Sequence, residues 1–202
     1  MGLVFHSGFE TGDFAEWAST TGAPEVQSAI KKTGTYAVRC NTSAATAFVS
    51  AGELSAGQAN FNLFITTAPD NEIKIMERGT TLNIRLTSDR YLKLYDGDSL
   101  LDTGTTQLPL SVFKRISFVV SDQIGHVSID GVEELSGTYA FISGEWLFGV
   151  ITSTTTILCF DDISVGVGIL YLDDIRVLRS SPKADGTNQG FNTPFPAGAR
   201  PW

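Results

Sequence analysis

Apolar and polar residues alternate with a period of two along most of this chain, in short stretches. In residues 60–66, Phe61, Leu63 and Ile65 fall on one face of an extended strand, and residues 35–41 repeat the pattern. Each stretch ends at Gly, Asp, Asn, Ser or Pro, the residues that favour turns. The pattern predicts strands over residues 25–30, 35–41, 46–50, 60–66, 72–78, 81–87, 91–95, 99–103, 113–121, 125–129, 132–136, 146–152, 156–163 and 168–178.

The segments between the predicted strands favour tight hairpins. Asp96-Gly97-Asp98 and Asp130-Gly131 lie between apolar strands, where glycine can adopt the positive φ that short hairpin loops need. Successive strands are therefore expected to be antiparallel neighbours. Strands with one apolar face and one more polar face predict two antiparallel sheets packed face to face. We therefore expect an all-β jelly-roll sandwich.

Two stretches near the ends of the chain are expected to lie side by side. Residues 9–17 combine large aromatic residues with carboxylates, so the rings can be buried while the acids converge on an oxygen-rich corner. Residues 171–178 form an apolar strand with the acid pair Asp173-Asp174 in its middle. We expect this last strand to lie beside the corner and to close the sandwich.

The composition changes after residue 178. The remaining residues are rich in Pro and Gly, which excludes a regular helix or a central strand. We therefore predict a sandwich over residues 1–178 and an irregular C-terminal arm over residues 179–202. The arm carries Phe191, Phe195 and Trp202, which we expect to bind a neighbouring subunit.

The net charge, the absence of targeting segments and the two cysteines narrow the classes of protein that the sequence fits. The formal net charge is −8, which disfavours binding to nucleic acid or to an anionic membrane. The sequence shows no secretion signal and no apolar run long enough to span a bilayer, so we expect neither export nor membrane insertion. Cys40 and Cys159 lie in apolar runs and are expected to be reduced core thiols.

Several motifs, in this order, resemble the concanavalin A-like, laminin-G-like jelly-roll domains. They are GFETGDFAEW (residues 8–17), KTGTYAVRC (32–40), LNIRLTSD with LKLYD (82–89 and 92–96), VSIDG (127–131) and YLDDI (171–175). The resemblance covers residues 3–178. With a tail like that of residues 182–187, the chain is similar to the signal-less versions encoded by tailed bacteriophages. This fold carries lectins, hydrolases, lyases and structural modules, so the resemblance alone implies no single function.

No arrangement that catalyses reactions on related sandwiches is visible. Glycoside hydrolases of this kind resemble one another in a strand with carboxylates at alternate positions, and Glu133-Glu134 does not have that spacing. Related polysaccharide lyases use a Gln-x-His strand, whereas Gln123 and His126 are one position too far apart. The other histidine, His6, stands alone, and no Cys/His metal cluster occurs. We expect no enzymatic activity.

Two functions fit these observations. The first is a structural virion protein, such as a capsid-decorating or appendage protein, made in the host cytoplasm. Its partners would be other virion proteins and further copies of itself, held through the arm. The alternative is a lectin-like module that recognises glycans. Its candidate contacts are Tyr91, Tyr95 and Trp146, which could stack on sugar faces. Asn83 and Arg85 lie nearby in sequence.

The resemblance also implies a structural calcium ion. In related jelly rolls the N-terminal corner and the last strand hold Ca²⁺, which would be bound here by Glu10, by the carbonyl of Gly12 and by Asp174. A rival acid pair, Asp161-Asp162, leaves the ligand set open. The other possibility is that no ion binds and that Glu10 accepts backbone hydrogen bonds.

Overall fold

The protein is built of antiparallel strands. The computed structural model describes residues 2–54, 57–121, 123–139 and 144–167, and these residues contain no helix and hence none that could cross a membrane. The strands are β1 (Gly2–Ser7), β2 (Ser19–Thr21), β3 (Glu25–Gln27), β4 (Ala37–Glu53), β5 (Gln58–Thr67), β6 (Ile73–Arg78), β7 (Leu82–Leu86), β8 (Leu92–Asp96), β9 (Ser99–Thr103), β10 (Lys114–Ser121), β11 (Ile124–Ile129), β12 (Val132–Thr138) and β13 (Glu145–Val167). The all-β prediction is confirmed.

Some predictions fall on the part of the chain that is not described. These are the last predicted strand, the acid pair Asp173-Asp174 and the C-terminal arm with Phe191, Phe195 and Trp202. The division of the chain at residue 178 also lies there, so it stays a prediction.

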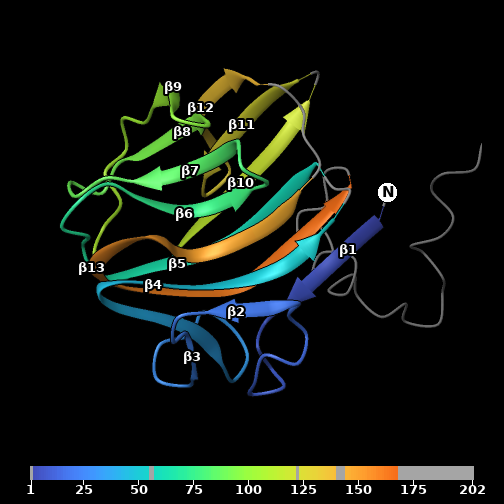
Figure 1. The fold of residues 1–202 in the computed structure, drawn as a ribbon, viewed down its shortest axis with the longest axis vertical. Coiled ribbons are helices and arrows are strands. Elements are labelled where there is room, and N and C mark those ends of the chain that lie inside the picture. The colour runs from blue at the N-terminus through green and yellow to red at the C-terminus, as the bar shows by residue number, and fades with distance from the viewer. Residues whose placement is uncertain (1, 55–56, 122, 140–143, 168–202) are drawn as a thin grey trace, which may run out of the picture. The chain divides into compact units, whose positions relative to one another are not determined.

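The strands form two layers that share their longest members. Hydrogen bonding follows the order β12-β11-β10-β5-β13-β6-β7-β8-β9, and β4 pairs with β13 along most of its length (Figure 1). The N-terminal part of β13 pairs with β6, and its C-terminal part pairs with β5. The two layers meet face to face, since the rings of Phe118 on β10 and Trp146 on β13 lie 6.2 Å apart.

Both long strands bend where they pass between the layers. The register of β13 against β4 shifts between Val150 and Thr154, and Ala44 on β4 has a φ of 51°. The hydroxyl of Thr42 donates to the Thr154 carbonyl at 2.8 Å, and this side-chain hydrogen bond links the two strands at the bend. The sequence predicts one strand on each side of each bend, whereas the structure has a single continuous strand in both cases, β4 and β13.

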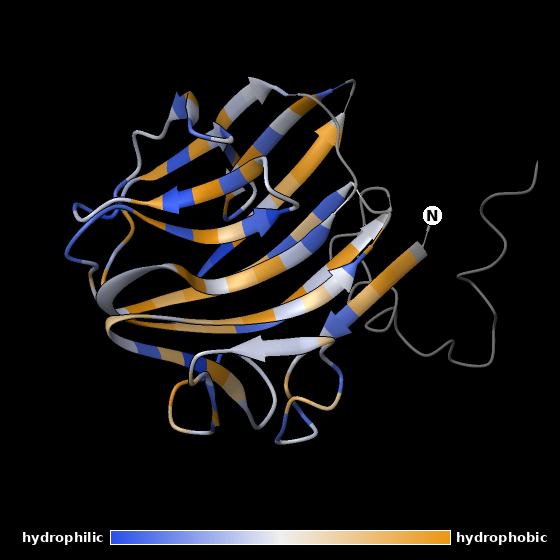
Figure 2. Ribbon diagram, in the orientation of Figure 1, coloured by the Kyte–Doolittle hydropathy of each residue, from blue (hydrophilic) through white to orange (hydrophobic). Residues whose placement is uncertain are grey.

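The alternating pattern positions the core as predicted. Phe61, Leu63 and Ile65 are each 1% exposed, and Figure 2 shows hydrophobic and hydrophilic residues alternating along strands such as β7 and β11. The loop after Ile129 is also confirmed, because Asp130 and Gly131 both have positive φ, as a tight hairpin of this kind requires.

Cys40 and Cys159 are free and buried, as expected, and burial raises the pKa of Cys40 to about 12 and that of Cys159 to about 11.

The N-terminal corner is anchored by its rings. Phe9 is fully buried, and its ring stacks on the Trp17 ring with the ring centres 5.4 Å apart. The Trp17 ring in turn packs edge-to-face against Phe148 in the core, with the ring centres 6.4 Å apart. The backbone turns sharply, with Gly12 at a φ of 77° and its N–H donating to the Phe9 carbonyl at 2.9 Å. The predicted burial is confirmed for Phe9 and Trp17, whereas Phe14 is half-buried.

Candidate functional site

Charged and polar side chains cover the outer face of β6, β7 and β8. Strand pairing places Lys74 opposite Arg85, and Arg85 opposite Lys93. Ile84 and Leu94, which lie between them along the strands, are fully buried, so the charged side chains point away from the core. We call this surface the charged face; it consists of Glu72, Lys74, Glu77, Asn83, Arg85, Lys93, Tyr95 and Asp98.

Arg85 lies at the centre of the charged face. Its Nε donates to Asn83 Oδ1 at 2.7 Å, and its Nη2 donates to the Gly97 carbonyl at 3.0 Å and to Asp98 Oδ1 at 2.9 Å. Its guanidinium carbon lies 3.8 Å from the centre of the Tyr95 ring, close enough for a cation–π contact. The guanidinium is thus held in one position.

Carboxylates compensate the row of cations. Glu72 Oε2 accepts from Lys93 Nζ at 2.7 Å and Glu72 Oε1 lies 3.5 Å from Arg85 Nη1, while Lys74 pairs with Glu77 at 2.8 Å. Burial opposes ionisation of Glu72, but the hydrogen bond from Lys93 and the charge of Arg85 outweigh it and lower its pKa. The same hydrogen bond raises the pKa of Lys93. Both groups are therefore charged at neutral pH.

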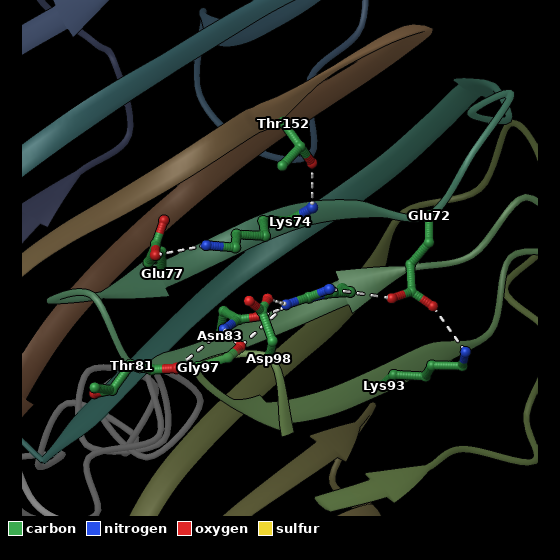
Figure 3. Close-up of polar contacts among 10 residues, drawn as sticks. Glu72, Lys74, Glu77, Thr81, Asn83, Lys93, Gly97, Asp98 and Thr152 are labelled. Atoms are coloured by element: carbon green, nitrogen blue, oxygen red, sulfur yellow. Dashed lines mark hydrogen bonds and ion pairs between the residues drawn. The ribbon is translucent and has the colours of Figure 1, made fainter. Parts of the chain in front are cut away.

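The charged face is rigid and partly exposed. Asn83 is fully buried, and its Nδ2 donates to the carbonyls of Thr81 and Gly97, both at 3.0 Å (Figure 3). The side chains of Lys74 and Lys93 remain 22% and 26% exposed. Ligand-binding groups held by a sheet and by one another lose little freedom on binding.

The structure places the three predicted glycan contacts in three different environments. Tyr91 is half-buried and precedes Lys93 by two residues, which places it on the same side of the extended chain and at the rim of the charged face. Tyr95 is 8% exposed and lies beneath Arg85. Trp146 is fully buried between the layers, so its ring is a core residue and is not available to a sugar.

Glu10 in the N-terminal corner binds backbone groups. Its Oε1 and Oε2 accept from the Thr35 N–H at 3.0 and 2.9 Å, and Tyr36 N lies 3.4 Å from Oε1. The hydrogen bond from Thr35 lowers the pKa of Glu10 despite some desolvation. A Cβ on Gly12 would lie 3.5 Å from the Tyr36 ring, so this glycine faces an aromatic side chain.

The rival acid pair lies next to the first strand, since β1 pairs with the end of β13. Asp161 is fully buried, and its Oδ2 accepts from the N–H groups of Lys32 and Thr33 at 2.7 and 3.1 Å. Asp162 accepts from the Thr33 hydroxyl at 2.7 Å and from Asn62 Nδ2 at 3.0 Å. These carboxylates bind residues 32–33 of one loop and Asn62 on β5, and they do not converge on a single point.

The calcium site that the resemblance implies is only partly covered by the described residues and stays a prediction. Among them, no group of three or more His, Cys, Asp or Glu side chains is placed to hold a metal. Both oxygens of Glu10 are engaged by Thr35, and Asp174 lies outside the described residues. The geometry of Glu10 agrees with the alternative in which it accepts backbone hydrogen bonds.

We expect the melting temperature to be the same in excess calcium and in excess chelator, because Glu10 already has partners. Thermal unfolding of the full-length chain in the two buffers measures this. An ion bound only to the folded state would raise the melting temperature by several degrees at saturation. Such a rise would contradict our expectation and would bring Asp174 back as a ligand.

The histidines lie apart from the charged face. His126 on β11 has its Nδ1 3.3 Å from Glu133 Oε2 on β12, and His6 is exposed on β1. Gln123 lies in the turn before β11, with a φ of 65°. The absence of enzymatic activity stays a prediction.

The described residues form a β-sandwich that carries a charged outer face, and comparison with solved structures agrees with this fold. No protein-family model matches the sequence, and no curated protein is similar to it in sequence. The chain superposes on a Trypanosoma rangeli sialidase mutant that displays trans-sialidase activity, with a TM-score of 0.59 and 14% identity, covering 87% of this chain and 32% of the sialidase. The chain thus spans about a third of that protein.

Two further structures were solved with a glycan bound. One is domain 4 of AbnA, an extracellular arabinanase of Geobacillus stearothermophilus, in complex with arabinotriose; the TM-score is 0.55 and the identity 16%, over 81% of this chain and 92% of that domain. The other is the binding domain of botulinum neurotoxin DC in complex with SialylT, with a TM-score of 0.53 and 10% identity, over 79% and 45%. At these identities the likeness shows the fold. None of these structures links the chain to a bacteriophage.

Proposed function

We propose that the protein is a carbohydrate-binding module without catalytic activity and that it binds its glycan on the charged face. The observation that carries this proposal is the fixed arrangement around Arg85, in which donors and acceptors from β7, from the residue before β6 and from the loop after β8 are held at defined positions. Sugar hydroxyls both donate and accept hydrogen bonds. A surface that offers ammonium and guanidinium donors beside carboxylate acceptors can satisfy both roles.

Apolar groups at the edge of the charged face could contact the C–H face of a sugar, which carries no hydroxyl groups. Tyr91 lies at one rim, and Leu100, which pairs with Tyr95 across β8 and β9, is 51% exposed. Rings and alkyl groups of this kind pack against the C–H faces of a pyranose. The glycan complexes of similar fold support the proposal, because they show that such sandwiches bind oligosaccharides.

The test is a glycan array probed with the full-length chain, followed by calorimetric titration of the best ligand. Replacing Arg85 by glutamine removes charge-assisted hydrogen bonds, so we expect the affinity to fall by about tenfold to a hundredfold. Lys114→Gln is the matched control, because Lys114 pairs with Asp130 at the hairpin of the other layer. If neither the native chain nor the Lys114→Gln control binds any glycan, the proposal is excluded.

The virion role predicted from the sequence depends on the C-terminal arm, which lies outside the described residues. None of the comparisons bears on that role, on the virion partners or on the location of the protein. It stays a prediction, and mass spectrometry of purified particles would test it. A glycan-binding module and a virion component are compatible, since the two roles use different parts of the chain.

A further inference from the structure

The row of cations on the charged face would be costly without the carboxylates beside it. Lys74, Arg85 and Lys93 are direct neighbours across three adjacent strands, and like charges opposite one another destabilise a sheet. The chain has only 14 lysines and arginines against 22 acidic residues. Polar but uncharged residues such as Thr would cover this face without repulsion. The row of cations therefore needs anions beside it, and a ligand that carries a carboxylate can supply one of them.

The carboxylates that compensate the row differ in how firmly they are held. Glu72 bridges Lys93 and Arg85, and its side chain is 26% exposed. Glu77 pairs with Lys74 and is 11% exposed. Asp98 contacts Arg85 at 2.9 Å, but it sits on the loop between β8 and β9 and its side chain is 97% exposed. Ion pairs this exposed are screened by water and contribute little.

Asp98 therefore occupies a position on Arg85 from which it is easily displaced. The Nη2 of Arg85 would keep its bond to the Gly97 carbonyl when Asp98 moves away. The face would then carry three cations against Glu72 and Glu77. A carboxylate from a ligand could take the place of Asp98 without loss of hydrogen bonds, and it would gain the field of the neighbouring ammonium groups.

We infer that the glycan bound by the charged face is acidic, and that a sugar carboxylate replaces Asp98 on Arg85. The inference rests on the proposed function and specifies its ligand class: oligosaccharides of uronic acids or other carboxylate-bearing sugars. Lys74 and Lys93 flank the bound carboxylate on either side, and Tyr91 and Leu100 contact the apolar parts of the sugar.

The probes are uronic-acid oligosaccharides, each compared with its carboxyl-reduced form, in which every carboxylate becomes a hydroxymethyl group and the linkages are unchanged. We expect the acidic form to bind the full-length chain at least about tenfold more tightly, because charge-assisted bonds to Arg are the strong ones. Raised salt should weaken the acidic form more than the reduced form.

Asp98→Ala tests the exchange itself. Removing the internal competitor should tighten binding of the acidic form by about two- to fivefold, the range of an exposed ion pair, and should leave the reduced form unchanged. Asp130→Asn is the matched control, because it also removes one negative charge from a hairpin loop, beside Lys114 rather than Arg85. Arg85→Gln should abolish the preference for the acidic form.

Each outcome decides a separate point. Equal binding of acidic and reduced forms would overturn the inference and leave the proposed function in place. A preference for the acidic form that Asp98→Ala changes no more than Asp130→Asn does would overturn the exchange on Arg85. If no oligosaccharide of either form binds, and the glycan array is also blank, the proposed function itself is wrong.

Discussion

Replacing Trp146 by alanine is expected to lower the free energy of unfolding by about 3–5 kcal/mol, the cost of removing a large buried ring. Trp146 is fully buried, and its ring lies 6.4 Å from Phe148, parallel to within 8°. Arg78 on β6 places its guanidinium carbon 5.1 Å from the centre of the Trp146 ring. The variant therefore loses core packing and also loses the ring that lies beside the buried Arg78.

Thermal and urea unfolding measure this effect. For a domain of this size each kcal/mol corresponds to about 2–4 °C, so the melting temperature should fall by roughly 6–20 °C. Trp146→Phe keeps a ring in place and should lose less. Val132→Thr, at a position 70% exposed, is the control and should change the stability by less than about 0.5 kcal/mol. A Trp146→Ala variant that melts normally and fails to bind glycan would contradict the assignment of Trp146 to the core.

Asp161→Ala is expected to lower the free energy of unfolding by about 2–4 kcal/mol, because it leaves backbone N–H groups without an acceptor. Asp161 Oδ2 accepts hydrogen bonds from the N–H groups of Lys32 and Thr33, and Asp161 Oδ1 accepts from the Asp162 N–H at 2.7 Å. Residues 32–33 would lose their main attachment to the sheet. Asp162→Ala is the comparison, because Asp162 is only half-buried and accepts from side chains; it should cost less.

Asp161 should also leave a signature in the pH dependence of stability. Burial raises its pKa to about 6, although hydrogen bonds from Thr33 and Lys32 oppose the shift. The folded state therefore binds a proton more readily than the unfolded state, so this contribution to stability is largest below the ordinary pKa and is lost as the pH rises through about 6. Asp161→Asn should remove this loss. An unchanged pH profile in Asp161→Asn would show that Asp161 does not titrate in this range.

The local pattern of the sequence predicts most of the strands, because alternation and turn residues are local signals. It missed β1 and β2, which are edge strands without clear alternation. It also divided β4 and β13, since a bend in a strand looks like a turn in the sequence. The hydrogen bond from Thr42 to the Thr154 carbonyl, which helps to hold the two strands together there, joins residues far apart in the chain.

The burial of Trp146 could not be predicted from its surroundings. Residues 146–150 are apolar on both faces of the strand apart from a glycine, so alternation does not tell which side is core. The pairing of Trp146 with Arg78 and the contact of its ring with Phe118 show that the ring lies in the core. Both contacts depend on how the layers pack.

The charged face was only partly visible in the sequence. Asn83 and Arg85 were noted near the candidate tyrosines, but Lys74 and Lys93 were missed. A signal existed: each cation occupies a polar position of a predicted strand, and two successive hairpins bring such positions into register. The contacts of Glu10 and Asp161 with residues 32–35 carried no such signal, because they join segments of different strands through an irregular loop.

The most direct measurement is to map the ligand onto the chain by nuclear magnetic resonance. Backbone amide shifts of the isotope-labelled full-length protein are recorded during titration with an oligosaccharide that binds in the array. We predict that the largest changes occur on β6, β7 and β8, centred on residues 83–85 and 93–98, and that they disappear in Arg85→Gln. Changes concentrated on β10, β11 and β12 instead, or changes that persist in Arg85→Gln, would contradict glycan binding by the charged face.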